Sequence, residues 1–225
     1  MSLIRISLLF LLALRMYASP ASAQTNQYLT REDSDPQALS LINKLEAQLN
    51  QDRLSLEFEM SISHPADEAI QQKGRFIQQG DMYRIIAEDV EIWCNGKLRW
   101  TYSKDANEVN LYAATDGDAL GPISLLAEYT GDQYVAILSG SDQIRSLPVQ
   151  VIELKPVDRN SEIAKIRVSV QNDGKPVRIE IMEKTATRTV TDFYKIGIPE
   201  THPESYFTFN KADYPGVHVE DLRID

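Results

Sequence analysis

The chain has 225 residues with 23 Lys and Arg against 33 Asp and Glu, which gives a formal net charge of −10 at pH 7. This acidic balance argues against a nucleic-acid-binding protein and against electrostatic docking on anionic lipid. Cys94 is the only cysteine, so an internal disulfide is excluded and the fold must depend on its apolar core.

Residues 1–23 have the layout of a secretory signal peptide. Arg5 supplies the positive charge, residues 8–14 form an apolar run too short to span a bilayer, and residues 21–23 read Ala-Ser-Ala, an A-x-A cleavage site. We therefore expect export and cleavage after Ala23. A lipoprotein signal would need cysteine at position 24, where Gln24 stands. The polar residues 24–34 predict a flexible N-terminal segment.

The first two predicted elements differ in their apolar period. Asp35-Pro36 is typical of an N-cap followed by proline at the first helical position. Apolar residues from Leu41 to Leu49 follow at helical spacing and predict an amphipathic helix over 35–50. From Leu54 to Ser63 apolar and polar residues alternate strictly, which predicts a strand with one buried face.

Short β segments follow to the C-terminus. Asn95-Gly96 supplies the two φ > 0 residues of a type I′ turn between strands at 90–94 and 98–103, a strong hairpin signal. Such short connections predict antiparallel strands and a long sheet that curls. The other predicted strands are 74–78, 82–87, 108–113, 134–138, 149–154, 163–170, 177–182, 188–194 and 206–209. A break at 116–131 predicts a short apolar helix after Gly121-Pro122, which is either a hinged lid or an ordinary helix over a sheet edge.

Motifs of catalysis or metal binding do not stand out. His64, His202 and His218 have no Cys, His or Asp at metal-ligand spacing. Cys94 lies in a predicted strand beside aromatic residues, which favours a buried and inert thiol over a nucleophile. We expect no catalytic residue, no metal site, no cofactor and no enzyme. A sequence pattern would not reveal a carboxylate pair that only the fold brings together.

Four segments in register carry a family resemblance. They are Leu41–Leu45 (LINKL) with the strand after it, Trp93–Tyr102 (WCNGKLRWTY), Gly121–Leu126 (GPISLL) and the ending Tyr206–Asp221 (YFTFNKADYPGVHVED). Together they resemble the LolA family of periplasmic outer-membrane lipoprotein carriers, over nearly the whole chain after the leader.

The resemblance implies a single domain over 35–225 with a mainly β (α+β) fold. In that fold an incomplete antiparallel β-barrel forms a strongly curved sheet, and helices cover its apolar concave face. It also implies a periplasmic monomer that takes acylated lipoproteins from an inner-membrane ABC exporter to an outer-membrane acceptor. Gln79 is a departure, since the family has there an arginine that holds the lid closed. A neutral amide makes weaker hydrogen bonds than a guanidinium group.

Strand phase and the resemblance together predict the side chains of an acyl-binding cavity. The lining set is Leu56, Phe58, Met60, Phe76, Trp93, Leu98, Trp100, Tyr102, Ile123, Leu125 and Leu126, and the lid set is Leu41, Leu45 and Pro122. Plain core packing is the alternative for each single residue. Three other functions stay open at this stage: a sensor of the same fold that binds lipoproteins and a membrane signalling protein, a carrier of another amphiphilic lipid, and a hydrolase with acids on the concave face.

Overall fold

The computed structural model describes residues 30–114 and 133–223. These ranges contain one α-helix, α1 (Pro36–Leu49), and three 3-10 helices, η1 (Arg31–Asp33), η2 (Glu204–Phe207) and η3 (Lys211–Asp213). The strands are β1 (Arg53–Ser63), β2 (Ile70–Gln79), β3 (Met82–Ala87), β4 (Val90–Asn95), β5 (Leu98–Ser103), β6 (Glu108–Ala113), β7 (Tyr134–Ile144), β8 (Leu147–Pro156), β9 (Ile163–Val170), β10 (Pro176–Glu183), β11 (Arg188–Gly197) and β12 (His218–Asp221).

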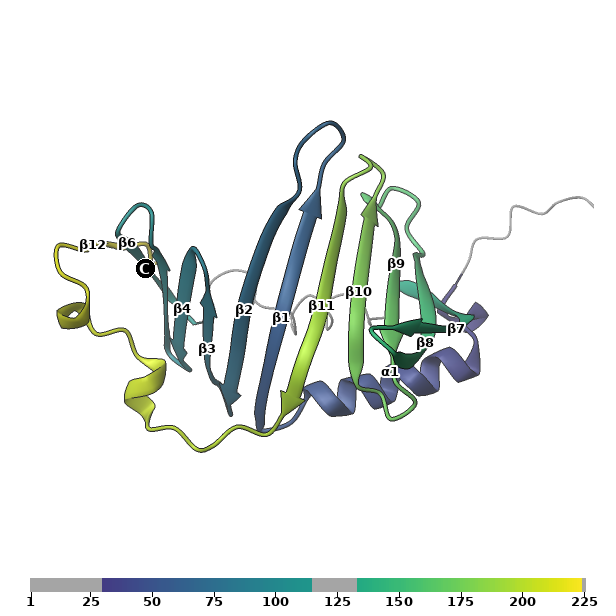
Figure 1. Ribbon diagram of the computed structural model, residues 1–225, viewed down its shortest axis with the longest axis horizontal. Coiled ribbons are helices and arrows are strands. Elements are labelled where there is room, and N and C mark those ends of the chain that lie inside the picture. Colours follow the sequence, from purple (N-terminus) through teal and green to yellow (C-terminus); the bar gives the residue numbers. More distant parts are fainter. Residues whose placement is uncertain (1–29, 115–132, 224–225) are drawn as a thin grey trace, which may run out of the picture.

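All the described strands form one open sheet, in the order β12-β6-β5-β4-β3-β2-β1-β11-β10-β9-β8-β7 (Figure 1). β1 to β6 and β7 to β11 are two antiparallel meanders, and β1 joins them by pairing with both β2 and β11. β7 and β12 are the two edges, so the sheet does not close into a barrel. The predicted fold class, a mainly β protein with a curved and incomplete antiparallel barrel, is therefore confirmed. β12 is an exception in direction, since it pairs parallel to β6.

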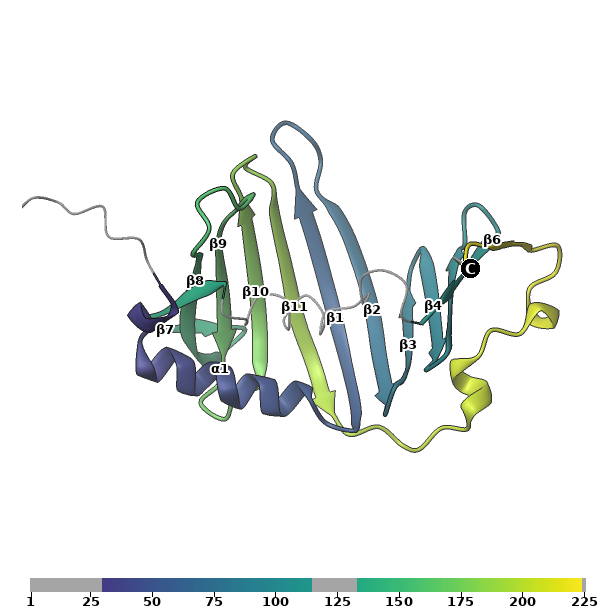
Figure 2. The ribbon, with the colours of Figure 1, turned by 180° about the vertical axis from the view of Figure 1, so that it is seen from behind.

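The predicted N-terminal helix is confirmed as α1. The Asp35 carboxylate accepts a hydrogen bond from the Gln37 backbone N–H at 2.7 Å, and Pro36 opens the helix. The buried face of α1 carries Leu41 and Leu45 and packs on the sheet. In Figure 2, α1 runs across the strands near one end of the sheet, beneath β9, β10 and β11. We call the side of the sheet that packs on α1 the helix face, and the other side the opposite face.

Each face of the sheet has its own apolar core. The larger core joins α1 to helix-face side chains from β1–β4 and β7–β11. The smaller core lies on the opposite face of β4, β5 and β6, where Trp93, Trp100 and Val109 pack with Val217. Because the chain from Ile198 to Val217 covers that second core, neither face of the sheet is uniformly exposed.

The C-terminal segment, residues 198–217, replaces one predicted strand. The prediction of a strand at 206–209 is wrong, because Glu204–Phe207 forms the 3-10 helix η2 and Phe207 is fully buried at 0% exposure. This segment returns from β11 along the edge of the molecule to β12 (Figure 1). Gln79 holds it in place, since its side-chain amide donates to the His202 carbonyl at 3.2 Å and accepts from the His202 N–H at 3.1 Å.

Candidate functional site

The helix face of β1 passes from buried to half-exposed along its length. Leu56, near α1, is fully buried and Phe58, further on, is 8% exposed. Met60 and Ile62 are only half-buried, and Ile70, which faces Ile62 across the β1–β2 pair, is 55% exposed. α1 crosses only one end of the sheet. The apolar side chains further along β1 are therefore not covered by α1, and no other described helix lies over them. We call Phe58, Met60, Ile62 and Ile70 the apolar strip.

The ring of Phe58 on the helix face has room to lie across the sheet because one of its two strand neighbours is a glycine. Phe58 pairs with Phe193 of β11 on one side and with Gly74 of β2 on the other. A Cβ atom at Gly74 would lie 2.6 Å from Cζ of Phe58, a distance that real Cβ contacts do not reach. Gly74 therefore allows the phenyl ring to lie across β2. Phe76, two residues along β2, stacks on Tyr83 with ring centroids 6.0 Å apart.

Polar side chains occupy the helix face at its β5 end, and sequence analysis missed them. Arg99 is only 5% exposed, and its guanidinium carbon lies 4.9 Å from the centre of the Tyr112 ring. Burial, and then the neighbouring Cys94, raises the pKa of Tyr83 from 10.0 to about 12, so this phenol stays protonated at pH values where a free tyrosine ionises. Arg99 alternates with Leu98 and Trp100 along β5, so only the register of β3–β5 could have placed it on the helix face.

The predicted lid residues divide between the described and the undescribed parts of the chain. Leu41 and Leu45 point into the core, at 9% and 0% exposure. Lys44 and Gln48, on the other side of α1, donate to the carbonyls of Asn172 and Asp173 in the β9–β10 turn, at 3.0 and 3.3 Å. These bonds fasten α1 to the sheet. The remaining predicted residues, Pro122, Ile123, Leu125 and Leu126, lie outside the described residues.

The structure corrects the predicted lining, because four of its members lie on the opposite face. Phe76 pairs with Ile85, and Ile85 with Ile92, so these three side chains share the helix face. Trp93 follows Ile92 and points the other way, with Trp100 as its cross-strand partner. The corrected residues are Trp93, Leu98, Trp100 and Tyr102, which pack on the C-terminal segment in the second core. They cannot line one hollow with Leu56, Phe58, Met60 and Phe76.

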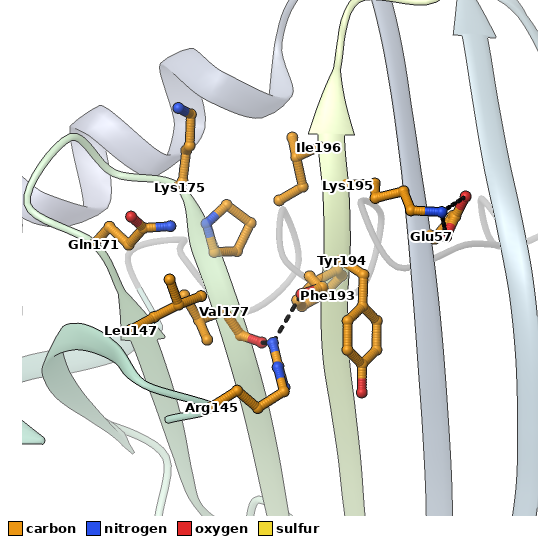
Figure 3. Close-up of a pocket in the computed structure, with 11 residues that line it drawn as sticks. Glu57, Arg145, Leu147, Gln171, Lys175, Val177, Phe193, Tyr194, Lys195 and Ile196 are labelled. Atoms are coloured by element: carbon orange, nitrogen blue, oxygen red, sulfur yellow. Dashed lines mark hydrogen bonds and ion pairs between the residues drawn. The ribbon is translucent and has the colours of Figure 1, made fainter. Parts of the chain in front are cut away.

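A pocket of about 340 Å³ opens on the opposite face where β10 and β11 separate (Figure 3). Pairing of these strands begins at Arg178 and Asp192, so Val177 and Phe193 lie just beyond it. Arg145, from the β7–β8 turn, bridges the gap by donating to the carbonyls of Val177 and Phe193 at 3.2 and 2.9 Å.

The charged side chains of this pocket already have protein partners. Arg145 also pairs with Asp192 and lies 4.4 Å over the Tyr194 ring. Lys195 pairs with Glu57 at 3.0 Å, as Figure 3 shows, and Lys175 pairs with Asp173 at 3.2 Å. We therefore interpret the contacts around this pocket as structural, because they attach the β7–β8 hairpin to β10 and β11.

The histidines contact protein groups and do not cluster. His64 lies 3.1 Å from the Thr187 hydroxyl, His202 stacks on Tyr206 at 4.1 Å, and His218 lies 3.2 Å from Glu220. Within residues 30–114 and 133–223, no three His, Cys, Asp or Glu side chains are arranged to hold a metal ion. In the same ranges no helix combines the length and the apolar character needed to span a membrane.

Comparison with known proteins places the chain by its fold. No protein-family model and no curated protein sequence matches it. Among solved structures, it is similar to an uncharacterized conserved protein from Thermus thermophilus, at a TM-score of 0.51 and 10% identity, over 82% of this chain and 99% of the other.

Two further similarities have lower TM-scores. A LolA superfamily protein from Nitrosomonas europaea matches at a TM-score of 0.40 and 15% identity, over 76% of this chain and 97% of the other. MucB, in the Pseudomonas aeruginosa MucA/MucB complex, matches at a TM-score of 0.38 and 11% identity, over 77% and 61%. At these identities the likeness to the solved structures concerns the fold alone, and the resemblance of the sequence to the LolA family stays a prediction.

Proposed function

We propose that this protein is a periplasmic carrier that binds the acyl chains of lipoproteins on the helix face and moves them from the inner to the outer membrane. The observation that carries the proposal is the apolar strip, which continues the buried core beyond α1 and becomes steadily more exposed. An apolar surface that extends from a core and is only partly covered is typical of a binding site for apolar ligands.

The energetics of the cargo favour a site of this kind. Moving an acyl chain from lipid into water costs about 0.8 kcal/mol per CH₂, so a chain of about sixteen carbons costs about 12 kcal/mol. A carrier therefore needs apolar area more than oriented polar groups. Phe58 and the half-buried Ile62 supply such area, and Met60 adds an unbranched side chain that adapts to irregular ligands. The partners implied are an inner-membrane ABC exporter as donor and an outer-membrane acceptor.

A matched pair of variants on β1 tests acyl binding. Met60 and Ser61 are adjacent and both half-buried, but their side chains lie on opposite faces of the sheet. Met60→Asp places a charge on the apolar strip and should weaken binding of a fluorescent triacylated peptide at least tenfold, because an unpaired carboxylate is costly in apolar surroundings. Ser61→Asp should bind as the wild-type protein does, and far-ultraviolet circular dichroism checks that both variants fold. Equal binding by the two variants would refute the proposed site.

Vesicle transfer separates the carrier from its alternatives. Protein loaded with the fluorescent lipopeptide is mixed with acceptor vesicles that contain outer-membrane extract, and the fluorescence that appears in the vesicles is measured. Transfer supports a carrier. Retention of the lipopeptide together with a stable complex with a membrane protein would instead indicate a sensor, and cleavage of the lipopeptide would indicate a hydrolase.

A further inference from the structure

We propose that a second site, on the opposite face, binds a single sugar ring of a neutral saccharide. The site is a cavity of about 270 Å³ between β3–β4 and the C-terminal segment. Trp93, Arg84 and Tyr214 form its inner wall, and Ser205, Asn210 and Asp213 are exposed at its rim. We call it the C-terminal pocket. It lies on the other side of the sheet from the apolar strip, so this inference does not depend on the proposed carrier function.

The inner wall is aromatic and rigid. Trp93 is 3% exposed, and its ring packs at 5.7 Å against Tyr214 and at 5.5 Å against Phe209. Tyr214 in turn contacts Tyr102 at 4.8 Å. Aromatic side chains fixed in this way offer an apolar surface together with a polar edge. Arg84 covers the Trp93 ring, so the half-buried ring of Tyr214 is the aromatic surface left for the C–H face of a pyranose ring to contact.

Arg84 is fixed in the wall of the pocket, and one of its N–H donors makes no hydrogen bond within the described residues. Its guanidinium group lies between the rings of Trp93 and Tyr206, at 5.2 and 4.7 Å, and its Nη2 donates to Glu91 at 3.0 Å. Its Nε atom is buried and has no hydrogen-bond partner among the residues that the structure describes. A buried N–H without a partner is costly and needs an explanation. A ligand oxygen in the pocket that Arg84 lines would supply an acceptor.

The charges of the pocket favour a neutral ligand. Glu91 neutralises Arg84, and Asp213 at the rim disfavours an anion such as phosphate. A cation is disfavoured as well, because Arg84 already occupies the face of Trp93.

Asn210 is already used within the rim, since its amide donates to Asp213 at 3.2 Å and accepts from the Ala212 N–H at 3.2 Å. The Ser205 hydroxyl can both donate and accept a hydrogen bond, and the Asp213 carboxylate can accept one from a sugar hydroxyl. The volume of about 270 Å³ lies just below the range for ligand pockets, about 300–1,000 Å³, which limits the ligand to about one ring.

Intrinsic fluorescence provides the test, because the chain has only two tryptophans and Trp93 lines the pocket. The purified protein is titrated with N-acetylglucosamine, methyl β-glucopyranoside and, separately, inorganic phosphate. We expect a saturable change with at least one sugar, at a Kd of about 1 mM as suits so small a ligand, and none with phosphate. Ser205→Phe, which fills the mouth, should raise that Kd at least tenfold.

The neighbouring residue gives the control. Glu204 is exposed and does not line the pocket, so Glu204→Phe should leave the Kd unchanged. The inference is overturned if neither sugar gives a saturable change, if phosphate alone does, or if Ser205→Phe binds sugar as well as the wild-type protein. Loss of lipopeptide binding in Met60→Asp leaves each of these outcomes unchanged, so the two proposals fail separately.

Discussion

Gly74→Ala tests the geometry on which the candidate acyl site depends. The new Cβ would lie 2.6 Å from Cζ of Phe58 and 2.9 Å from the Ile86 carbonyl oxygen, so the phenyl ring or the backbone must move. Overpacking of this kind costs about 1–3 kcal/mol. Gly74 is not at positive φ, so alanine would otherwise stabilise the protein by about 0.4–1 kcal/mol through the unfolded chain. The net expectation is a loss of about 1–2 kcal/mol.

Urea unfolding of a double-mutant cycle measures this effect and its cause. Phe58→Leu shortens the side chain that the new Cβ would strike, so Gly74→Ala should cost less in that background, with a coupling energy of at least about 0.5 kcal/mol. The slope of the unfolding free energy against urea should stay constant, which would show that stability alone has changed. A change below about 0.5 kcal/mol for Gly74→Ala, or strict additivity with Phe58→Leu, would refute the reasoning.

Three further predictions concern other contacts of the fold. Gln79→Leu removes both hydrogen bonds to His202 and should therefore speed hydrogen exchange at the His202 amide. The control is Gln78→Leu, on the other face of β2, which should leave that exchange rate unchanged. Equal exchange rates in the two variants would contradict this prediction. Arg145 reaches the Asp192 carboxylate and the two carbonyls from two separate nitrogens, whereas the lysine in Arg145→Lys has a single ammonium nitrogen. Urea unfolding should therefore show a loss of about 1–2 kcal/mol, and an unchanged midpoint would disprove the role of Arg145. Because burial raises the pKa of Tyr83 from 10.0 to about 12, folding favours the protonated phenol, and its stabilisation is full below pH 10 and lost as the pH rises to about 12. An ultraviolet titration should show a tyrosine step near pH 12 that is absent from Tyr83→Phe, and a wild-type step near pH 10 for this residue would contradict the burial.

Local patterns predicted the elements well because their causes are local. Asp35-Pro36 and the apolar spacing after it define α1, and the strict alternation from Leu54 to Ser63 defines β1. The hairpin and the common face of Trp93 and Leu98 were also predicted correctly, but the type I′ turn was wrong: Gly96 alone has a positive φ, at +85°, Asn95 belongs to β4, and Trp93 pairs with Trp100. Each of these inferences needs only the dihedral preferences and side-chain period of one segment.

The face of the β4–β5 hairpin relative to β1 could not be predicted in the same way. It depends on the register of β2, β3 and β4 in turn, and a slip of one residue moves every side chain to the other face. The sequence of β4 does not indicate which of its faces belongs to the core with α1, because both faces are buried: Ile92 and Cys94 on one and Trp93 on the other. The cover over Trp93 comes from the C-terminal segment, more than a hundred residues later in the chain.

Photolabelling of the unmodified protein tests the central claim most directly. A triacylated peptide with a diazirine in one acyl chain is bound, irradiated and mapped by mass spectrometry, with unlabelled lipopeptide as competitor. The account predicts competed adducts on helix-face side chains of β1, above all Phe58, Met60 and Ile62. Adducts on Glu59 and Ser61 of the opposite face, or adducts that the competitor does not reduce, would contradict it.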